Sequence, residues 1–172
     1  FKKKKPLLEK WILLVSGLLL GLAVWLMHFM GILACKLPEN YTFDFALTVV
    51  SYLVAAISAI FAIWMTTRPT LPLGRLMLGA ILMGLGISGM HYIGMAGLNI
   101  PNYHLHYDPL LVMLSIVIAV SGTGLSFWLM FKHKISIQHK FIFKLLASVA
   151  CAFSIVGMHY TGMAAANLQL FD

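Results

Sequence analysis

Long apolar runs dominate the chain, and polar residues are confined to the short stretches between them. Each run is at least as long as the roughly 20 residues that a helix needs to cross the hydrocarbon core of a bilayer. None shows the two-residue alternation of a barrel strand. The pattern therefore predicts an all-α fold, a polytopic transmembrane helix bundle with five spans. The predicted spans are 11–35, 44–66, 73–98, 109–131 and 141–166.

Composition excludes a water-soluble domain. Of the 172 residues, 61% are hydrophobic and 10% are charged, and the mean hydropathy is +0.93. A soluble domain carries about 25% charged residues, so we expect the lipid bilayer to be the solvent of this chain. The net charge of +7 does not indicate nucleic-acid binding, because the basic residues form short clusters between apolar runs. Two cysteines give no disulfide framework.

The basic residues also predict an orientation. Eleven of the twelve Lys and Arg residues precede the first run or lie between the second and third or the fourth and fifth runs, and only Lys36 lies on the other side. Positive charge is retained on the cytoplasmic side of membrane proteins. The N-terminus is therefore expected in the cytoplasm and the C-terminus outside.

An eight-residue motif recurs in alternate runs, with a period of about 65 residues. Residues 27–34 read Met-His-Phe-Met-Gly-Ile-Leu-Ala, residues 90–97 read Met-His-Tyr-Ile-Gly-Met-Ala-Gly, and residues 158–165 read Met-His-Tyr-Thr-Gly-Met-Ala-Ala. The helices between the motifs match as well, because Asp44 and Ser51 recur as Asp108 and Ser115. The bundle is thus predicted to consist of repeated helix pairs, each carrying a Met-His-Tyr-type motif.

Helical spacing places the donor atoms of each motif on one arc. Residues four apart share a helix face, so His91 lies beside Met95 and Met90 beside Gly94, near the external end of the span. The glycine leaves room for a neighbouring helix or a ligand. Imidazole and thioether suit copper, while imidazole also binds zinc or haem iron. The candidate metal ligands are His28, His91, His159, Met27, Met90, Met158, Met95 and Met163.

The first motif departs from the pattern, because Ile32 stands where the second methionine belongs. We therefore expect its helix to contribute less to a metal site. Cys35, seven residues after His28, returns to the same face of a continued helix and is a further candidate, as are Tyr92 and Tyr160 beside the arc. The alternative is that the histidines only make hydrogen bonds between helices, because a polar residue inside a membrane usually has a partner or a task.

Two further features of the sequence lie outside the motif. Gly84, Gly86 and Gly89 spell a dinucleotide-binding fingerprint, but they lie inside a span with no preceding strand, so we expect them to mediate close helix packing. His104 and His106, in the external loop 99–108, could capture a metal or belong to a solvated loop, and their role stays open. No catalytic set or phosphate loop is present in the sequence, so no enzymatic activity is expected within this chain.

The threefold pattern, complete as Met158-His159-Tyr160-Thr161, resembles the MHYT domain, a bacterial integral-membrane sensor family. The resemblance implies that residues 1–172 are a sensor domain of the bacterial inner membrane, binding copper through these residues. It further implies sensing of oxygen, carbon monoxide, nitric oxide or a redox signal. The signal would pass to a cytoplasmic output domain on the same polypeptide, such as a cyclic-di-GMP cyclase or phosphodiesterase. A start at Phe1 rather than Met agrees with a fragment that lacks leading and trailing helices.

Two alternatives remain at this point. A copper transporter would need a ladder of ligands along the bundle, and a haem-binding bundle would use two histidines as axial ligands. The metal, its oxidation state and the oligomeric state, a homodimer included, stay open.

Overall fold

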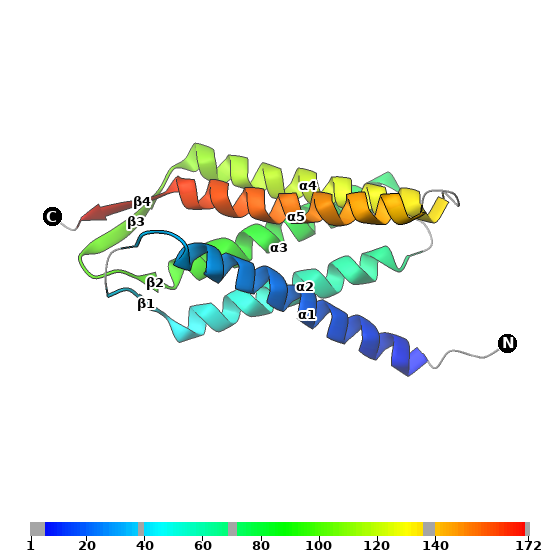
Figure 1. Ribbon diagram of the computed structural model, residues 1–172, viewed down its shortest axis with the longest axis horizontal. Coiled ribbons are helices and arrows are strands. Elements are labelled where there is room, and N and C mark those ends of the chain that lie inside the picture. The colour runs from blue at the N-terminus through cyan, green and yellow to red at the C-terminus, as the bar shows by residue number, and fades with distance from the viewer. Residues whose placement is uncertain (1–5, 38–39, 69–71, 136–139, 171–172) are drawn as a thin grey trace.

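The computed structural model of the protein describes residues 6–37, 40–68, 72–135 and 140–170. Five long helices run along one axis (Figure 1), and each contains a segment long and apolar enough to cross a membrane. The predicted five-helix bundle is thereby confirmed. The helices are α1 (Pro6–Leu33), α2 (Phe45–Thr66), α3 (Leu73–Ala96), α4 (Pro109–Ile135) and α5 (Lys140–Ala165).

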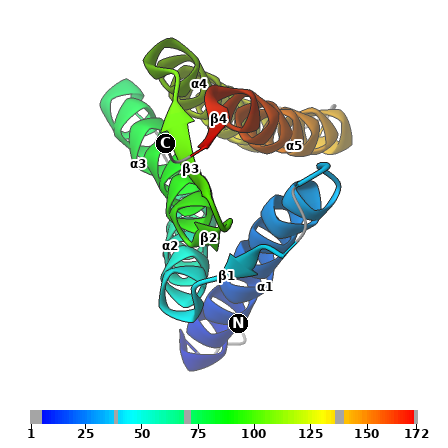
Figure 2. The same cartoon turned by 90° about the vertical axis from the view of Figure 1, so that its left-hand side faces the viewer.

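Alternate helices have different positions in the bundle. Helices α1, α3 and α5, which carry the three motifs, run in one direction, and α2 and α4 run in the other. Helix α2 packs against α1 and α3, and α4 packs against α3 and α5. Seen from one end, the three motif helices face a common centre (Figure 2). The connectivity therefore brings all three motifs to the same end of the bundle.

Two short antiparallel ribbons close this motif end, and the sequence pattern had not predicted them. Strand β1 (Thr42–Phe43) pairs with β2 (Leu98–Asn99), and β3 (Tyr103–Tyr107) pairs with β4 (Ala166–Leu170) (Figure 1). The segment expected to be a loop at 99–108 is thus largely strand. Its alternation of aromatic or apolar residues with histidine is the period-two signal of a half-buried strand, which is too short here to stand out.

The repeated aspartates join the outer helices to the motif helices. The carboxylates of Asp44 and Asp108 accept hydrogen bonds from amide groups in the first turns of α2 and α4, each with one contact of 2.8 Å. The backbone N–H of Asp44 donates to the carbonyl of Gly97 at 2.7 Å, and that of Asp108 donates to Ala165 at 2.9 Å. Each repeat therefore caps its outer helix and anchors that cap to the end of the next motif helix.

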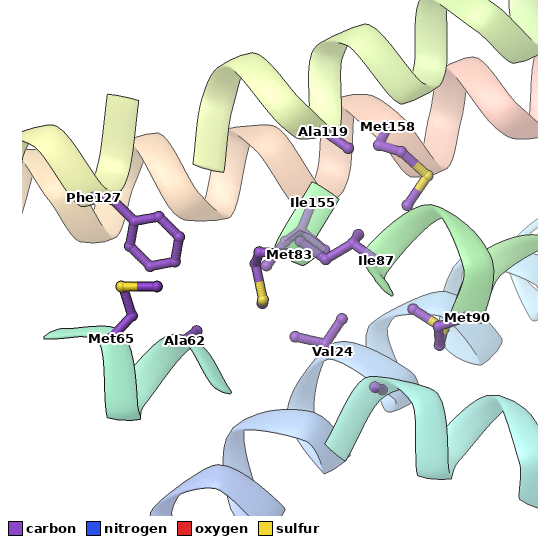
Figure 3. Close-up of a cluster of buried hydrophobic side chains, with 11 residues drawn as sticks. Val24, Ala62, Met65, Met83, Ile87, Met90, Ala119, Phe127, Ile155 and Met158 are labelled. Carbon is purple, nitrogen blue, oxygen red and sulfur yellow. The ribbon is translucent and has the colours of Figure 1, made fainter. Parts of the chain in front are cut away.

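The interior between the motifs and the opposite end of the bundle is hydrophobic. Val24, Ile87 and Ile155, each four residues before a motif histidine, are buried in one cluster around Met83 (Figure 3). At the far end of this cluster, the thioether of Met65 lies beside the ring of Phe127, a contact that sulfur and aromatic rings favour.

Glycines let α3 approach both outer helices closely, as the sequence predicted. A Cβ atom added to Gly84 would lie 2.7 Å from the Cα of Val120 on α4, which is closer than carbon atoms can pack. One added to Gly86 would collide with the side chain of Ser58 on α2. At Gly86 the side chain of Ser58 could rotate away from an added Cβ atom. At Gly84 the neighbouring atom is backbone, which cannot move aside in this way.

We predict that Gly84→Ala lowers stability by about 1–3 kcal/mol, the usual cost of overpacking a core. Gly74→Ala is the matched control on the same helix, because a Cβ there meets nothing within 4 Å. It should leave stability unchanged or raise it by about 1 kcal/mol through helix propensity. Unfolding in detergent, followed by circular dichroism, measures both variants. Equal midpoints would contradict the close α3–α4 contact.

Candidate metal centre

Three histidines from three helices meet inside the bundle. His28 on α1, His91 on α3 and His159 on α5 each have 0% of their surface exposed. Their candidate ligand atoms all lie within 4.8 Å of one another. The predicted convergence of the three motifs is therefore found, and no ring faces lipid. We call these residues the histidine triad.

The triad turns its Nδ1 atoms toward one another. His28 Nδ1 lies 3.0 Å from His91 Nδ1 and 3.3 Å from His159 Nδ1. Two nitrogens bound to one metal at about 2.0 Å with tetrahedral angles are roughly 3.3 Å apart. The rings are nearly perpendicular in pairs, at 79°, 85° and 90°. These spacings suit either a proton shared between imidazoles or a metal ion held among them.

A glycine from a neighbouring motif receives each imidazole. A Cβ atom added to Gly94 would collide with Nε2 of His28, one added to Gly162 with Nε2 of His91, and one added to Gly31 with Nε2 of His159. The contacts form a closed ring in which α1 packs into α3, α3 into α5 and α5 into α1. The motif glycine therefore makes room for the histidine of another helix, one of the two possibilities left open by the sequence.

The same contacts decide which nitrogen faces the centre. With Nε2 pressed against a helix backbone, Nδ1 is the atom that each ring presents to the other two. Within the described residues, Nε2 of His28 and Nε2 of His159 have no hydrogen-bond partner. A buried polar atom without a partner costs about 1–3 kcal/mol, so each one in a native protein calls for an explanation, such as a redox role or a bound ion. A metal at Nδ1 would fix the proton on Nε2 and thus suits this ring orientation.

Two apolar layers enclose the triad along the bundle axis. The methionine before each histidine faces the hydrophobic cluster around Met83: Met90 and Met158 are fully buried there, and Met27 packs against it. On the side of the ribbons, Met95 and Ile32 are buried in a second cluster, with Met163 packed against it. The triad is therefore shielded from water, with the predicted thioether residues in the layers above and below it.

The remaining candidates lie outside the triad. Helix α1 ends at Leu33, so Cys35 does not continue the ligand face, and its thiol donates to the carbonyl of Gly31 at 3.4 Å. Tyr160 stacks edge-on against His159 but is 55% exposed on the outer surface of the bundle. Tyr92 also stacks against its histidine, and its hydroxyl is hydrogen-bonded to Ser115 at 2.7 Å.

The first repeat has a different hydrogen bond in the place of the Tyr92–Ser115 bond. Phe29 has no hydroxyl, and the indole N–H of Trp25 donates instead to Ser51, the counterpart of Ser115, at 3.0 Å. Trp25 packs against Phe29 with ring centroids 4.6 Å apart. In the second repeat the aromatic residue of the motif itself bonds the motif helix to its outer helix, and in the first repeat Trp25, which packs against Phe29, makes the equivalent bond. Nδ1 of His28 lies close to Nδ1 of both other histidines, so the first motif brings its imidazole into the triad although Ile32 replaces the second methionine. A smaller contribution of the first helix to metal binding stays a prediction.

His104 and His106 take no part in this centre. Both are exposed, because β3 turns alternate residues outward while Tyr103, Leu105 and Tyr107 pack toward the bundle. They lie opposite Gln169 and Asn167 across the ribbon. The metal-binding alternative for this pair therefore has no third ligand from His, Cys, Asp or Glu among the described residues.

Family comparison agrees with this division into helix pairs. Residues 21–79 and 84–140 each match the MHYT family, described as a bacterial signalling protein N-terminal repeat. The chain belongs to the MHYT family. Each matched segment contains the motif-bearing part of one motif helix and the outer helix that follows it, α1 with α2 and α3 with α4. The third motif lies beyond both matched segments.

Three relatives place the domain within signalling proteins. The chain is 44% identical to the bifunctional diguanylate cyclase/cyclic di-GMP phosphodiesterase MucR of Pseudomonas aeruginosa over 88% of its length. It is 35% identical over 96% to the cyclic di-GMP phosphodiesterase NbdA of the same organism, and 32% identical over 94% to the signaling protein YkoW of Bacillus subtilis. The chain covers 22%, 21% and 20% of these relatives. No solved structure matches.

The chain therefore corresponds to the MHYT sensory domain of these cyclic di-GMP cyclase and phosphodiesterase homologues. It is a multi-pass membrane protein, as they are. The sequence had pointed to the histidines through their repetition. It gave no sign of the cyclic pairing of each histidine with another motif's glycine, since that pairing depends on how α1, α3 and α5 are arranged in space.

We predict that Gly94→Ala displaces the His28 ring and weakens metal binding at least tenfold. Gly89→Ala on the same helix is the control, because a Cβ there makes only an ordinary contact of 3.8 Å with Val54. Titration of both purified variants with copper measures the effect. Wild-type affinity in Gly94→Ala would show that the glycine contact does not hold the imidazole in place.

Proposed function

We propose that residues 1–172 form one MHYT sensor domain that binds a single copper ion through Nδ1 of His28, His91 and His159. The observation that carries the proposal is a buried cluster of three imidazoles whose ligand atoms lie within 4.8 Å of one another, with Nδ1 of His28 3.0 Å and 3.3 Å from Nδ1 of the other two. When bound, the metal would supply a centre that binds a diatomic gas or changes redox state. The protein's own part is to hold three imidazoles on three different helices and to exclude water.

Copper is favoured over zinc by the side chains around the triad. Five methionines lie in the layers above and below it: Met27, Met90, Met158, Met95 and Met163. Thioethers are soft ligands that select Cu(I), whereas zinc sites draw on thiolate, imidazole and carboxylate. The described residues near the triad include no carboxylate that would complete a zinc site. A methionine is accordingly the proposed fourth ligand.

The same surroundings count against the two alternatives. A transporter needs successive ligands along the bundle, but Val24, Ile87 and Ile155 form an apolar layer one turn before the histidines. A haem needs a flat space between its two axial imidazoles, and the three rings have centroids only 4.8 to 5.3 Å apart. The triad therefore suits a small ion that stays bound better than it suits a transported ion or a haem.

We further propose that the triad lies near the external face of the bacterial inner membrane. The concentration of Lys and Arg at the other end supports this orientation. The signal would be oxygen, carbon monoxide, nitric oxide or a change in redox state. It would reach a cytoplasmic cyclic-di-GMP cyclase or phosphodiesterase domain on the same polypeptide, as the names of the relatives suggest.

Copper titration of the purified protein tests the site. We expect one ion per chain, and we expect His28→Ala, His91→Ala and His159→Ala each to weaken binding by tenfold or more, because each removes one of three ligands. His106→Ala is the matched control, since that imidazole is exposed on the ribbon. Affinity equal to wild type in all three triad variants would leave only a packing role for the histidines.

The signalling role is tested in a full-length protein that carries this domain. Cyclic-di-GMP turnover in membranes should change when copper or a diatomic gas is added. His28→Ala should abolish that change while the basal turnover persists. A response of wild-type size in His28→Ala would contradict a sensor that works through the triad.

A further inference from the structure

A large cavity lies next to the triad, at the motif end of the bundle. It has a volume of about 860 Å³ and lies between the ribbons and the ends of α3 and α4. Its wall includes Tyr92 and Met95, which follow His91 on α3 by one and four residues. The Tyr92 ring is 4.8 Å from that of His91, and Met95 is 1% exposed, one helical turn beyond His91. The cavity is therefore separated from the triad by one layer of side chains.

Copper has few other ways to reach a centre that is fully buried. An ion cannot enter from the lipid side, because transfer of a charge into hydrocarbon is strongly unfavourable. From the opposite end of the bundle it would have to pass the apolar cluster of Val24, Ile87 and Ile155 and the methionines beside it. The other described cavities are lined by residues at the opposite end or on the outer face of α4 and α5, and none includes a triad or motif residue.

The lining of the large cavity can pass a partly hydrated cation without trapping it. It contains tyrosine hydroxyls, asparagine amides and the imidazole of His104, and no Asp, Glu, Lys or Arg. Burial and the neighbouring Tyr92 raise the pKa of Tyr107 to about 12, so this hydroxyl stays neutral at physiological pH. Neutral oxygen and nitrogen donors can solvate a cation without trapping it as a carboxylate cluster would.

We propose that this cavity is the entry chamber for copper, and that the ion passes from its wall to the triad by way of the Met95 thioether. The inference rests on the proposed copper site and adds the route by which that site is filled. Of the two second methionines, Met95 and Met163, only Met95 lines the cavity, so entry is expected through the second repeat alone.

The test compares two equivalent positions of the repeat. Ala96 and Ala164 each follow their histidine by five residues and are exposed, but only Ala96 lines the cavity. Cu(I) is delivered from a coloured chelator, and uptake is followed by the loss of the chelator's absorbance, which an added tryptophan does not disturb. We expect Ala96→Trp to slow uptake at least tenfold with unchanged stoichiometry and final affinity. Ala164→Trp should load at the wild-type rate.

Three outcomes would overturn the chamber: wild-type uptake in Ala96→Trp, equal slowing in Ala164→Trp, or no uptake by the wild type. The last also ends the proposed copper site, whereas the first two leave it intact. If Ala96→Trp bound less than the wild-type number of copper ions, that would point to misfolding. Uptake is then measured in Thr42→Trp, because Thr42 also lines the cavity. Normal uptake by that variant would contradict the proposal as well.

Discussion

The close approach of three helices at three glycines sets the geometry of the whole motif end. Each imidazole fills the space that a side chain would take on the next motif helix, at Gly31, Gly94 or Gly162. Because the three contacts form a closed ring, a shift of one helix must disturb both of its neighbours. This ring fixes the depth of the histidines, turns Nδ1 toward the centre, and leaves the outer helices to hold the motif helices from outside.

That arrangement explains why the motif combines such different residues. Histidine supplies the central nitrogen and glycine the space for another motif's histidine. In the second repeat the aromatic residue after the histidine reaches the outer helix through the Tyr92–Ser115 hydrogen bond, whereas in the first repeat Trp25, which precedes His28, bonds to Ser51 instead. The flanking apolar residues close the site on both sides. A sensor built in this way links its ligand atoms directly to the spacing of α1, α3 and α5, so a ligand that changes the triad can change the packing of the bundle.

The sequence was sufficient to predict the spans, the repeat and the triad, because hydropathy and a period of about 65 residues are properties of the chain itself. It was less informative where the answer depended on three dimensions. Ile32 made the first motif look weaker, although Nδ1 of His28 lies 3.0 Å and 3.3 Å from Nδ1 of the other two histidines. Cys35 was placed on the ligand face by extending a helix that in fact ends at Leu33. The ribbons and the cavity arise from segments too short for their alternation to be recognised.

X-ray absorption spectroscopy at the copper edge tests the central claim most directly, because it reports the ligands of the bound metal without relying on affinity. For the copper-loaded wild type we predict three imidazole nitrogens at about 2.0 Å, with one imidazole fewer in each of His28→Ala, His91→Ala and His159→Ala. A spectrum with one imidazole or none, or one that these substitutions leave unchanged, would show that the three histidines pack the bundle together and do not bind the metal.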